Sequence, residues 1–301
     1  MKQKSKLNKF GPWYGCVILA LSAQSAWSAI SVQSFSAATN DRFANHLSFV
    51  GAGYDFSGVG RDALGHWAVM LSPTVFLSAN HHRPVGSLIF YGGNDPTATP
   101  QSIAIDEGQR IGGTDLYIGR LESPVSAAIK NYSFVTVPPG SINTLANAFV
   151  FMSGISPTTS GYGSGSPDVT DQTVGTNRIE GFQAGLTVGD AVGDIIYTIR
   201  NLSGDGLYGY GVTSYEAQLA GGDSGSPLFA ISGGNLVVAG ISWAVGSLTT
   251  VAGPRDFSAF TYTGSYAGDI QDYVALAVVP EPASVMLISI AGILLGVRRR
   301  K

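Results

Sequence analysis

The sequence predicts an all-β protein built of barrels or a sandwich, and three observations support this. Its 301 residues include 40 glycines, and glycine supplies the positive φ angles of tight turns. Short runs rich in β-branched and aromatic residues recur along the chain, each bounded by Gly, Pro, Asn or Ser. No long stretch of the body keeps helical periodicity. A hydrophobic content of 45% and a charged content of 12% also exclude a disordered chain.

The first segment, residues 1–29, is predicted to be a signal peptide. Four lysines between Lys2 and Lys9 precede an apolar stretch at 13–21 and a small-residue run at 22–29. This order of basic, apolar and small residues is typical of secretory signals, whereas an uncleaved anchor would need a longer apolar core. The only cysteine, Cys16, lies in this segment, so we expect the exported body to lack disulfides.

The body, residues 30–277, contains the expected strands and one helix. The predicted strands are 66–71, 87–91, 116–121, 148–152, 194–199 and 236–241. Residues 153–168, rich in Thr, Ser, Gly and Pro, are predicted to form a long exposed loop. Residues 267–277 predict a short amphipathic helix with Ile270, Tyr273, Val274 and Ala277 on one face.

The tail, residues 278–301, has three parts. Pro280-Glu281-Pro282 leads into an apolar run at 285–297, and a cluster of Arg and Lys closes the chain at 298–301. This tail resembles the PEP-CTERM sorting signal of Gram-negative bacteria. The resemblance implies a short transmembrane segment, cutting by an exosortase, and attachment or release at the cell surface. An ordinary tail anchor is the alternative.

The overall charge and the motif content exclude several classes of function. A net charge of −3 predicts no attraction of the body to nucleic acid. The histidines and carboxylates lack the spacing of metal ligands, and no Gly-rich phosphate loop precedes a helix. We therefore expect no metal and no cofactor.

Ser224 is the predicted nucleophile. It stands in Gly222-Asp223-Ser224-Gly225, where the flanking glycines allow a sharp turn. Such a turn can direct the amides of Gly222 and Ser224 toward one point, as an oxyanion hole requires. The apolar residues after Pro227 would anchor the loop in a strand. Alone, the motif also fits an ordinary hairpin turn.

A histidine that follows a strand supplies the predicted base. Ser72-Pro73 joins two strand-like runs, and the second run ends in Ser78-Ala79-Asn80-His81-His82. This segment resembles the Thr-Ala-Ala-His-Cys setting of chymotrypsin-like serine proteases, which implies that His81 is the catalytic base. His82 replaces the family's cysteine and is expected at the surface or behind the site. His46 and His66 are expected to be structural or exposed.

The resemblance extends to the acid of the triad. Gly113-Thr114-Asp115 precedes a strand and resembles the family's Asp-Ile-Ala-Leu-Leu segment, so Asp115 maps to the residue that orients the histidine. The 34-residue spacing from His81 is shorter than in many members of the family. Asp106 is the main rival, and Asp95 is a more distant one because it lies in a turn-like Asn-Asp-Pro sequence.

The same resemblance implies substrate-binding residues. Ser242-Trp243-Ala244 resembles the family's Ser-Trp-Gly strand, so Ser242 and Ala244 would bind an extended peptide through main-chain hydrogen bonds. Gln218 stands six residues before the nucleophile, where a primary pocket is set, and it offers no carboxylate for Lys or Arg. We expect a preference for small or medium uncharged side chains. We also expect Asp223 to be held by an internal basic group or by backbone amides.

Together these resemblances imply two packed six-stranded antiparallel barrels of chymotrypsin type, with a junction near residues 140–170. They imply an exported serine endopeptidase that acts on proteins or peptides and is processed by signal peptidase and exosortase in a Gram-negative envelope. A catalytically silent surface or matrix binding protein is the main alternative. An esterase on the same fold is the third possibility, since a triad also attacks esters.

Overall fold

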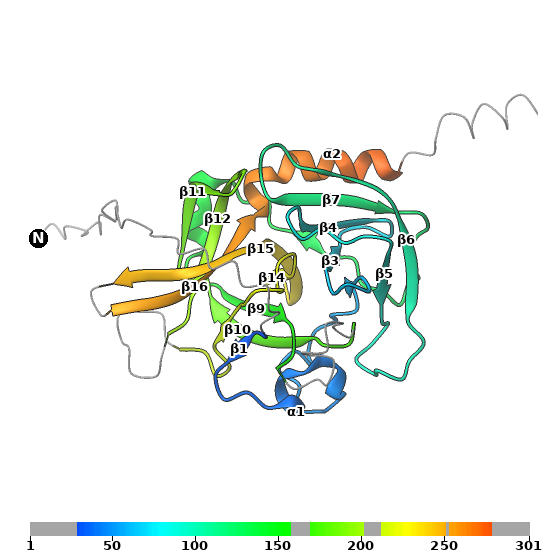
Figure 1. Cartoon of the computed structure of the whole chain (residues 1–301), viewed down its shortest axis with the longest axis horizontal. Coiled ribbons are helices and arrows are strands. Elements are labelled where there is room, and N and C mark those ends of the chain that lie inside the picture. The colour runs from blue at the N-terminus through cyan, green and yellow to red at the C-terminus, as the bar shows by residue number, and fades with distance from the viewer. Residues whose placement is uncertain (1–28, 158–168, 202–211, 251–252, 279–301) are drawn as a thin grey trace, which may run out of the picture.

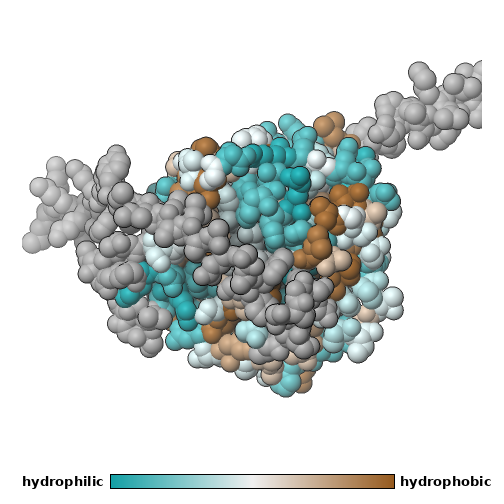
Figure 2. All heavy atoms as spheres, viewed as in Figure 1, coloured by the Kyte–Doolittle hydropathy of each residue, from teal (hydrophilic) through white to brown (hydrophobic). Residues whose placement is uncertain are grey.

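The computed structural model describes residues 29–157, 169–201, 212–250 and 253–278. Over these residues the protein is mostly β, with a barrel and a second large sheet side by side (Figure 1). The predicted sorting segments, including Cys16, lie outside the described residues. No helix within the described ranges is long and apolar enough to cross a membrane. The face seen in Figure 2 carries hydrophilic and hydrophobic residues intermixed.

The barrel is closed and has the six antiparallel strands that the sequence analysis implied for the first half of the body. Its order is β2-β3-β4-β7-β6-β5, with β5 also pairing with β2. The predicted strands 66–71, 87–91 and 116–121 are confirmed as β3, β5 and β7. The barrel strands are β2 (Val59–Arg61), β3 (Trp67–Met70), β4 (Val75–Ala79), β5 (Ser87–Phe90), β6 (Gln101–Arg110) and β7 (Leu116–Leu121).

The second sheet has eight strands and is open, whereas a second closed six-stranded barrel was expected. Its order is β10-β9-β14-β15-β16-β12-β11, and β8 pairs in parallel with β15. The strands are β8 (Ser133–Phe134), β9 (Phe149–Gly154), β10 (Thr173–Arg178), β11 (Gly181–Val188), β12 (Ala191–Ile199), β14 (Pro227–Ser232), β15 (Asn235–Thr250) and β16 (Gly253–Tyr262).

The outer edge of β10, at one end of the open sheet, is occupied by another segment of the chain. The Thr176 N–H donates to the Tyr215 carbonyl (2.8 Å), and Thr176 forms a parallel bridge with Glu216. The following strand, β13 (Ala217–Gln218), pairs with β1 (Ser31–Val32) near the N-terminus of the described chain. The segment around Glu216 therefore lies where β11 would have to pair for closure.

The barrel and the sheet share one hydrophobic core. Val69, Leu77 and Ile118 of the barrel belong to the same buried cluster as Phe229 and Ile241 of the sheet. The chain leaves the barrel after β7, which ends at Leu121, and enters the sheet at β8, which begins at Ser133. Because the two units pack directly on each other, loops from both can meet at their boundary.

The predicted helix is present, but the first residues of the predicted exposed loop are buried. Helix α2 (Ala267–Val278) buries Ile270 in the shared core, and Tyr273, Val274 and Ala277 pack against it, as the periodicity predicted. Residues 153–156, expected in an exposed loop, are buried at the end of β9 and just after it, and 158–168 lie outside the described residues. The other helical segments are α1 (Ala37–Asn40) and 3₁₀ turns at Arg42–Ala44, Pro139–Leu145 and Thr263–Tyr266.

Candidate active site

His81 and Asp115 are brought together by two neighbouring barrel strands. Ala79, the last residue of β4, pairs with Leu116, the first residue of β7. His81 follows β4 and Asp115 immediately precedes β7, so antiparallel pairing places them at the same end of the barrel. The Asn80 N–H also donates to the Asp115 carbonyl (2.6 Å), which fixes the two loops to each other.

The Asp115 carboxylate contacts His81 through both of its oxygens. Oδ2 lies 2.6 Å from His81 Nδ1, and Oδ1 accepts the His81 backbone N–H at 2.9 Å. Because a carboxylate only accepts, Nδ1 carries the ring proton and Nε2 is left as an acceptor. The Asp115 side chain is 2% exposed and that of His81 46% exposed, so the acid is buried and the base opens to solvent.

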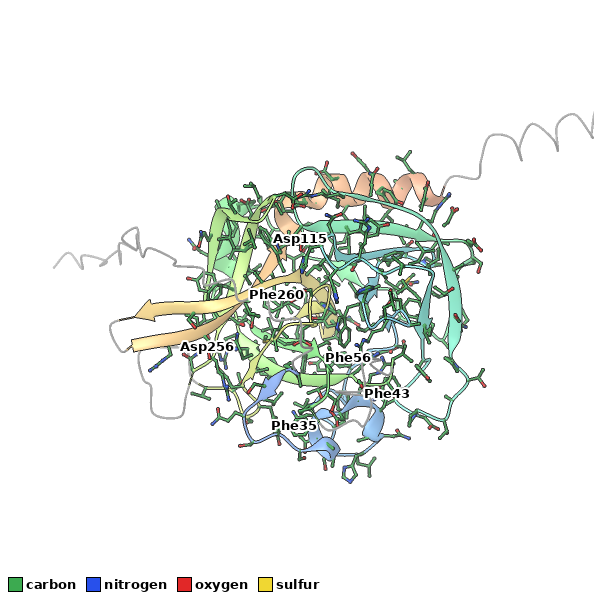
Figure 3. The ribbon with its side chains drawn as sticks, in the orientation of Figure 1. Phe35, Phe43, Phe56, Asp115, Asp256 and Phe260 are labelled. Carbon is green, nitrogen blue, oxygen red and sulfur yellow. The ribbon has the colours of Figure 1, made fainter. Side chains whose placement is uncertain are left out.

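Ser224 comes from the second sheet and completes the arrangement. Its loop lies between β13 and β14, and Ser224 Oγ is 2.9 Å from His81 Nε2. With Nε2 as acceptor, the Ser224 hydroxyl donates this bond. Figure 3 labels Asp115 below helix α2, in the region where the barrel meets the second sheet. The structure therefore brings the predicted His81, Asp115 and Ser224 into one hydrogen-bonded series.

The rival carboxylates have other contacts. Asp106 lies in β6, where its Oδ2 is 2.5 Å from Arg120 Nη2 and its side chain is 42% exposed. Asp95 accepts hydrogen bonds from the backbone and hydroxyl of Thr97 in an exposed turn. Between the predicted candidates, Asp115 is the one that contacts His81.

The residues expected to bind an oxyanion lie in a turn that requires glycine. Gly222 has φ +99°, a conformation that glycine adopts without strain. Its carbonyl accepts a hydrogen bond from Trp67 Nε1 (3.1 Å), which ties the turn to barrel strand β3. The amides expected to bind the oxyanion are those of Gly222 and Ser224, on either side of the Asp223 residue.

Asp223 is fully buried and is held by backbone amides, in agreement with the second of the two arrangements expected for it. Its Oδ1 accepts the Ile155 N–H (2.7 Å) and its Oδ2 accepts the Ala220 N–H (2.8 Å). Burial raises the pKa of Asp223 to about 7, against the lowering effect of these two amides and of the Arg61 charge. Ile30 and the Asp223 carboxylate both lie against Gly154. A Cβ built on Gly154 would be 2.7 Å from Ile30 Cβ and 2.9 Å from the carboxylate oxygens.

Gln218 is more constrained than a simple pocket residue. It is 8% exposed, and its Nε2 donates to the Phe257 carbonyl (2.9 Å) of β16. Its Oε1 is buried without a hydrogen-bond partner among the described residues. That oxygen is the polar group that Gln218 could still offer to a donor.

The three residues of the expected substrate strand differ in their contacts. Ser242 is already engaged on its main chain, because its N–H donates to the Ser226 carbonyl and its carbonyl accepts the Gly225 N–H, each at 2.9 Å. Trp243 is buried with Leu186, Ile195, Phe257 and their neighbours, in the interior of the sheet. Ala244 is partly exposed, so the free substrate-binding surface expected here would begin at Ala244.

A second cluster beside the triad was missed at the sequence level. Asp62 is buried with its Oδ2 2.7 Å from His66 Nδ1, and the His66 ring meets the His82 ring with centroids 4.2 Å apart. His82 Nδ1 in turn lies 3.4 Å from the Ser224 carbonyl. Two sequence signals were present: the His81-His82 pair, and Asp62 four residues before His66. Neither signal alone predicts that His66 and His82 are in contact.

No three His, Cys, Asp or Glu side chains gather as metal ligands would within the described part of the chain. No protein-family model matches the chain, and no curated protein sequence matches it either. The geometry of the site is therefore the basis for any functional assignment.

Proposed function

We propose that the protein is an exported serine endopeptidase of the chymotrypsin-like type, sorted to a Gram-negative cell envelope. One observation carries the proposal: Asp115, His81 and Ser224 form a continuous hydrogen-bonded series although His81 is 34 residues from Asp115 and 143 from Ser224. Nucleophilic catalysis by serine needs this order of acid, base and hydroxyl. On this proposal the closed barrel and the open sheet are the counterparts of the two barrels of such proteases.

The geometry supports attack by Ser224 on a peptide carbonyl. Oγ bonds to the carbonyl carbon while its proton moves to His81 Nε2, and the buried Asp115 carboxylate stabilises the resulting imidazolium. The amides of Gly222 and Ser224 would stabilise the negative oxygen. As the tetrahedral species collapses, the C–N bond breaks and Nε2 gives its proton to the leaving amine. Water, deprotonated by His81 Nε2, then attacks the acyl carbon, the ester C–O bond breaks, and Nε2 returns the proton to Ser224 Oγ.

Substrate recognition follows from the groups around this turn. Gln218 carries no negative charge that could pair with Lys or Arg, and Oε1 is its one side-chain polar atom without a partner among the described residues. The primary pocket would therefore accept uncharged rather than basic side chains. On this proposal, the side chain of the partly exposed Ala244 limits the size of the primary pocket. The body would act on extended peptide segments that pair with β15 from Ala244 onward, because β14 pairs with β15 only as far as Ile241. Signal peptidase and exosortase would process the two ends of the chain.

A fluorophosphonate probe tests the proposal directly, because it reacts covalently with an activated serine. The wild-type protein should be labelled once per chain, and Ser224→Ala should not be labelled. A folded wild-type protein that stays unlabelled would contradict the proposal and favour the silent binding protein. Turnover of esters without turnover of matched peptides would instead identify an esterase on the same triad.

A further inference from the structure

Two carbonyls of the nucleophile turn, those of Gly222 and Ser224, are held by ring N–H groups from the barrel side. Trp67 Nε1 donates to the Gly222 carbonyl at 3.1 Å, and His82 Nδ1 lies 3.4 Å from the Ser224 carbonyl. Because a carbonyl oxygen only accepts, His82 Nδ1 is the donor and carries the ring proton. The nucleophile turn is thus fixed to the barrel on either side of Asp223.

The Ser224–Gly225 peptide is bound at both of its polar ends. Its N–H, on Gly225, donates to the Ser242 carbonyl of β15 (2.9 Å), and its carbonyl accepts from His82 on the barrel. A peptide plane held from two sides fixes the backbone at Ser224, and with it the direction of Oγ relative to His81. Space is also tight, since a Cβ built on Gly225 would lie 2.9 Å from Ser78 Oγ.

His82 is backed by a second Asp–His pair. The Asp62 carboxylate accepts the backbone N–H groups of Leu64, His66 and Val85, at 2.8–2.9 Å, in addition to the His66 ring contact. Burial alone would raise the pKa of Asp62, but hydrogen bonds from His66 and Val85 hold it below its usual range. The His66 ring stands nearly perpendicular to the His82 ring, at 83°. Asp62 therefore fixes His66, and His66 packs against His82.

The charge state of His82 suits a neutral donor. The pKa of His82 is lowered to about 4, mainly by burial and in addition by the nearby His66 and His81 rings, while the Ser224 carbonyl and Asp62 act in the opposite direction. His82 is therefore neutral at neutral pH and adds no positive charge next to His81. It can donate to the Ser224 carbonyl without competing for the proton that His81 must accept.

We infer that His82, supported by His66 and Asp62, is a positioning residue for Ser224. By binding the Ser224 carbonyl it holds Oγ in line with His81 Nε2, and it acts without touching substrate. This inference rests on the proposed function. The contact between the His66 and His82 rings joins the segment before β3 to the segment after β4.

The test compares variants of the purified protein that keep or remove the donor. His82→Leu removes it, His82→Asn places an amide N–H close to the position of Nδ1, and His82→Gln places its amide one carbon farther out. His46→Leu is the matched control, because His46 is an exposed histidine outside the site. The endpoint of fluorophosphonate labelling counts active sites, so that the labelling rate constant and kcat are expressed per active site.

We expect His82→Leu and His82→Gln to lower kcat and the labelling rate constant about tenfold with little change in KM, because only transition-state alignment is lost. His82→Asn should recover most of the loss, and His46→Leu should match wild type. His66→Leu should slow labelling in the wild-type background and add nothing in the His82→Leu background, as expected for residues acting in series.

Each contrary result has a distinct meaning. Equal rate constants per active site in wild type, His82→Leu and His82→Gln would overturn the positioning role while leaving the protease assignment intact. An Asn variant as slow as the Leu variant would overturn the role of the donor. Absence of labelling in folded wild type would overturn the proposed function and this inference with it. If His82→Leu does not fold, the Gln and Asn variants decide the question.

Discussion

At the scale of single residues, the site depends on which atoms of each polar group are already occupied. Asp115 uses one carboxylate oxygen for the His81 ring and the other for the His81 backbone. Asp223 uses both oxygens for backbone amides, so it supports the turn and makes no contact with the base. Two aspartates near one serine thus have separate tasks, which the burial and the donors around each carboxylate determine.

Replacing Asp115 should abolish most of the activity. Asp115→Asn keeps the shape of the side chain but presents an N–H to His81, which favours the tautomer with the proton on the wrong nitrogen. We expect kcat to fall about 10⁴-fold, as for other triads. Asp106→Asn is the matched control, because Asp106 is paired with Arg120 on the barrel wall. A larger loss in Asp106→Asn than in Asp115→Asn would show that the acid is wrongly assigned.

His82 should make the protein less stable in acid. Its pKa is about 4 in the folded chain and about 6.5 in an unfolded one, so between these values the unfolded chain binds more protons. The stability it contributes is complete above about pH 6.5 and is lost as the pH falls toward 4. Urea unfolding at pH 7.5 and 4.5 should show wild type losing about 2 kcal/mol more than His82→Asn. Parallel losses in the two proteins would contradict this.

At the scale of elements, strand β15 links the nucleophile turn to the expected substrate edge. Its pairing with β16 shifts register between Ser242 and Ala244, so that Trp243 lies at a bulge. At the bulge the Trp243 side chain is buried in a hydrophobic cluster of the sheet, while Ser242 keeps its two backbone hydrogen bonds to the nucleophile loop. One irregular residue thus separates the part of β15 that holds Ser224 from the part that begins at Ala244.

Ala244 should limit the size of the side chain that the primary pocket accepts. Ala244→Val should lower kcat/KM about tenfold or more for substrates with medium uncharged side chains, because added methyl groups occupy the same space. Ala244→Gly should extend turnover to larger side chains. Peptides with glycine at that position serve as an internal control and should change little. The expectation fails if all substrates change by the same factor in both variants.

The sequence predicted some strands and missed others, and the missed ones include the buried β2 and β10. All residues of β7 except Arg120 are buried, and its limits match the predicted run. β6 was missed because most of its ten residues are polar and at least partly exposed, so its pattern resembles a loop. Ser224, His81 and Asp115 could be predicted because each stands in a local motif. The Asp62–His66–His82 cluster could not, because it depends on ring contacts between separate loops.

At the scale of the whole molecule, a body without cysteine must join its parts by packing and hydrogen bonds. Arg42 is 1% exposed, and its guanidinium donates to Asn94, to Gln172 and to the carbonyls of Val59, Tyr91 and Gly93. These partners belong to the barrel and to the segment that enters β10 of the sheet. The pairing at the outer edge of β10 had no local sequence signal, because it joins Thr176 to the distant Glu216.

Arg42 should therefore contribute strongly to the stability of the whole body. Burial lowers the pKa of Arg42 to about 10, which leaves it protonated at neutral pH and reliant on its acceptors. Arg42→Met keeps much of the volume but leaves five acceptors without their donor, and we expect a loss of about 3 kcal/mol or more in the free energy of unfolding. Arg42→Lys should fall between, since an ammonium has three donors and no planar fork.

Urea unfolding followed by tryptophan fluorescence measures these differences, and Lys130→Met is the matched control because it removes a cation from an exposed position. That control should change stability by about 0.5 kcal/mol or less. Because the Arg42 partners lie in both units, a single unfolding transition should shift as a whole in Arg42→Met. Two separate transitions, with only one of them shifted, would mean that Arg42 stabilises one unit and does not join the two.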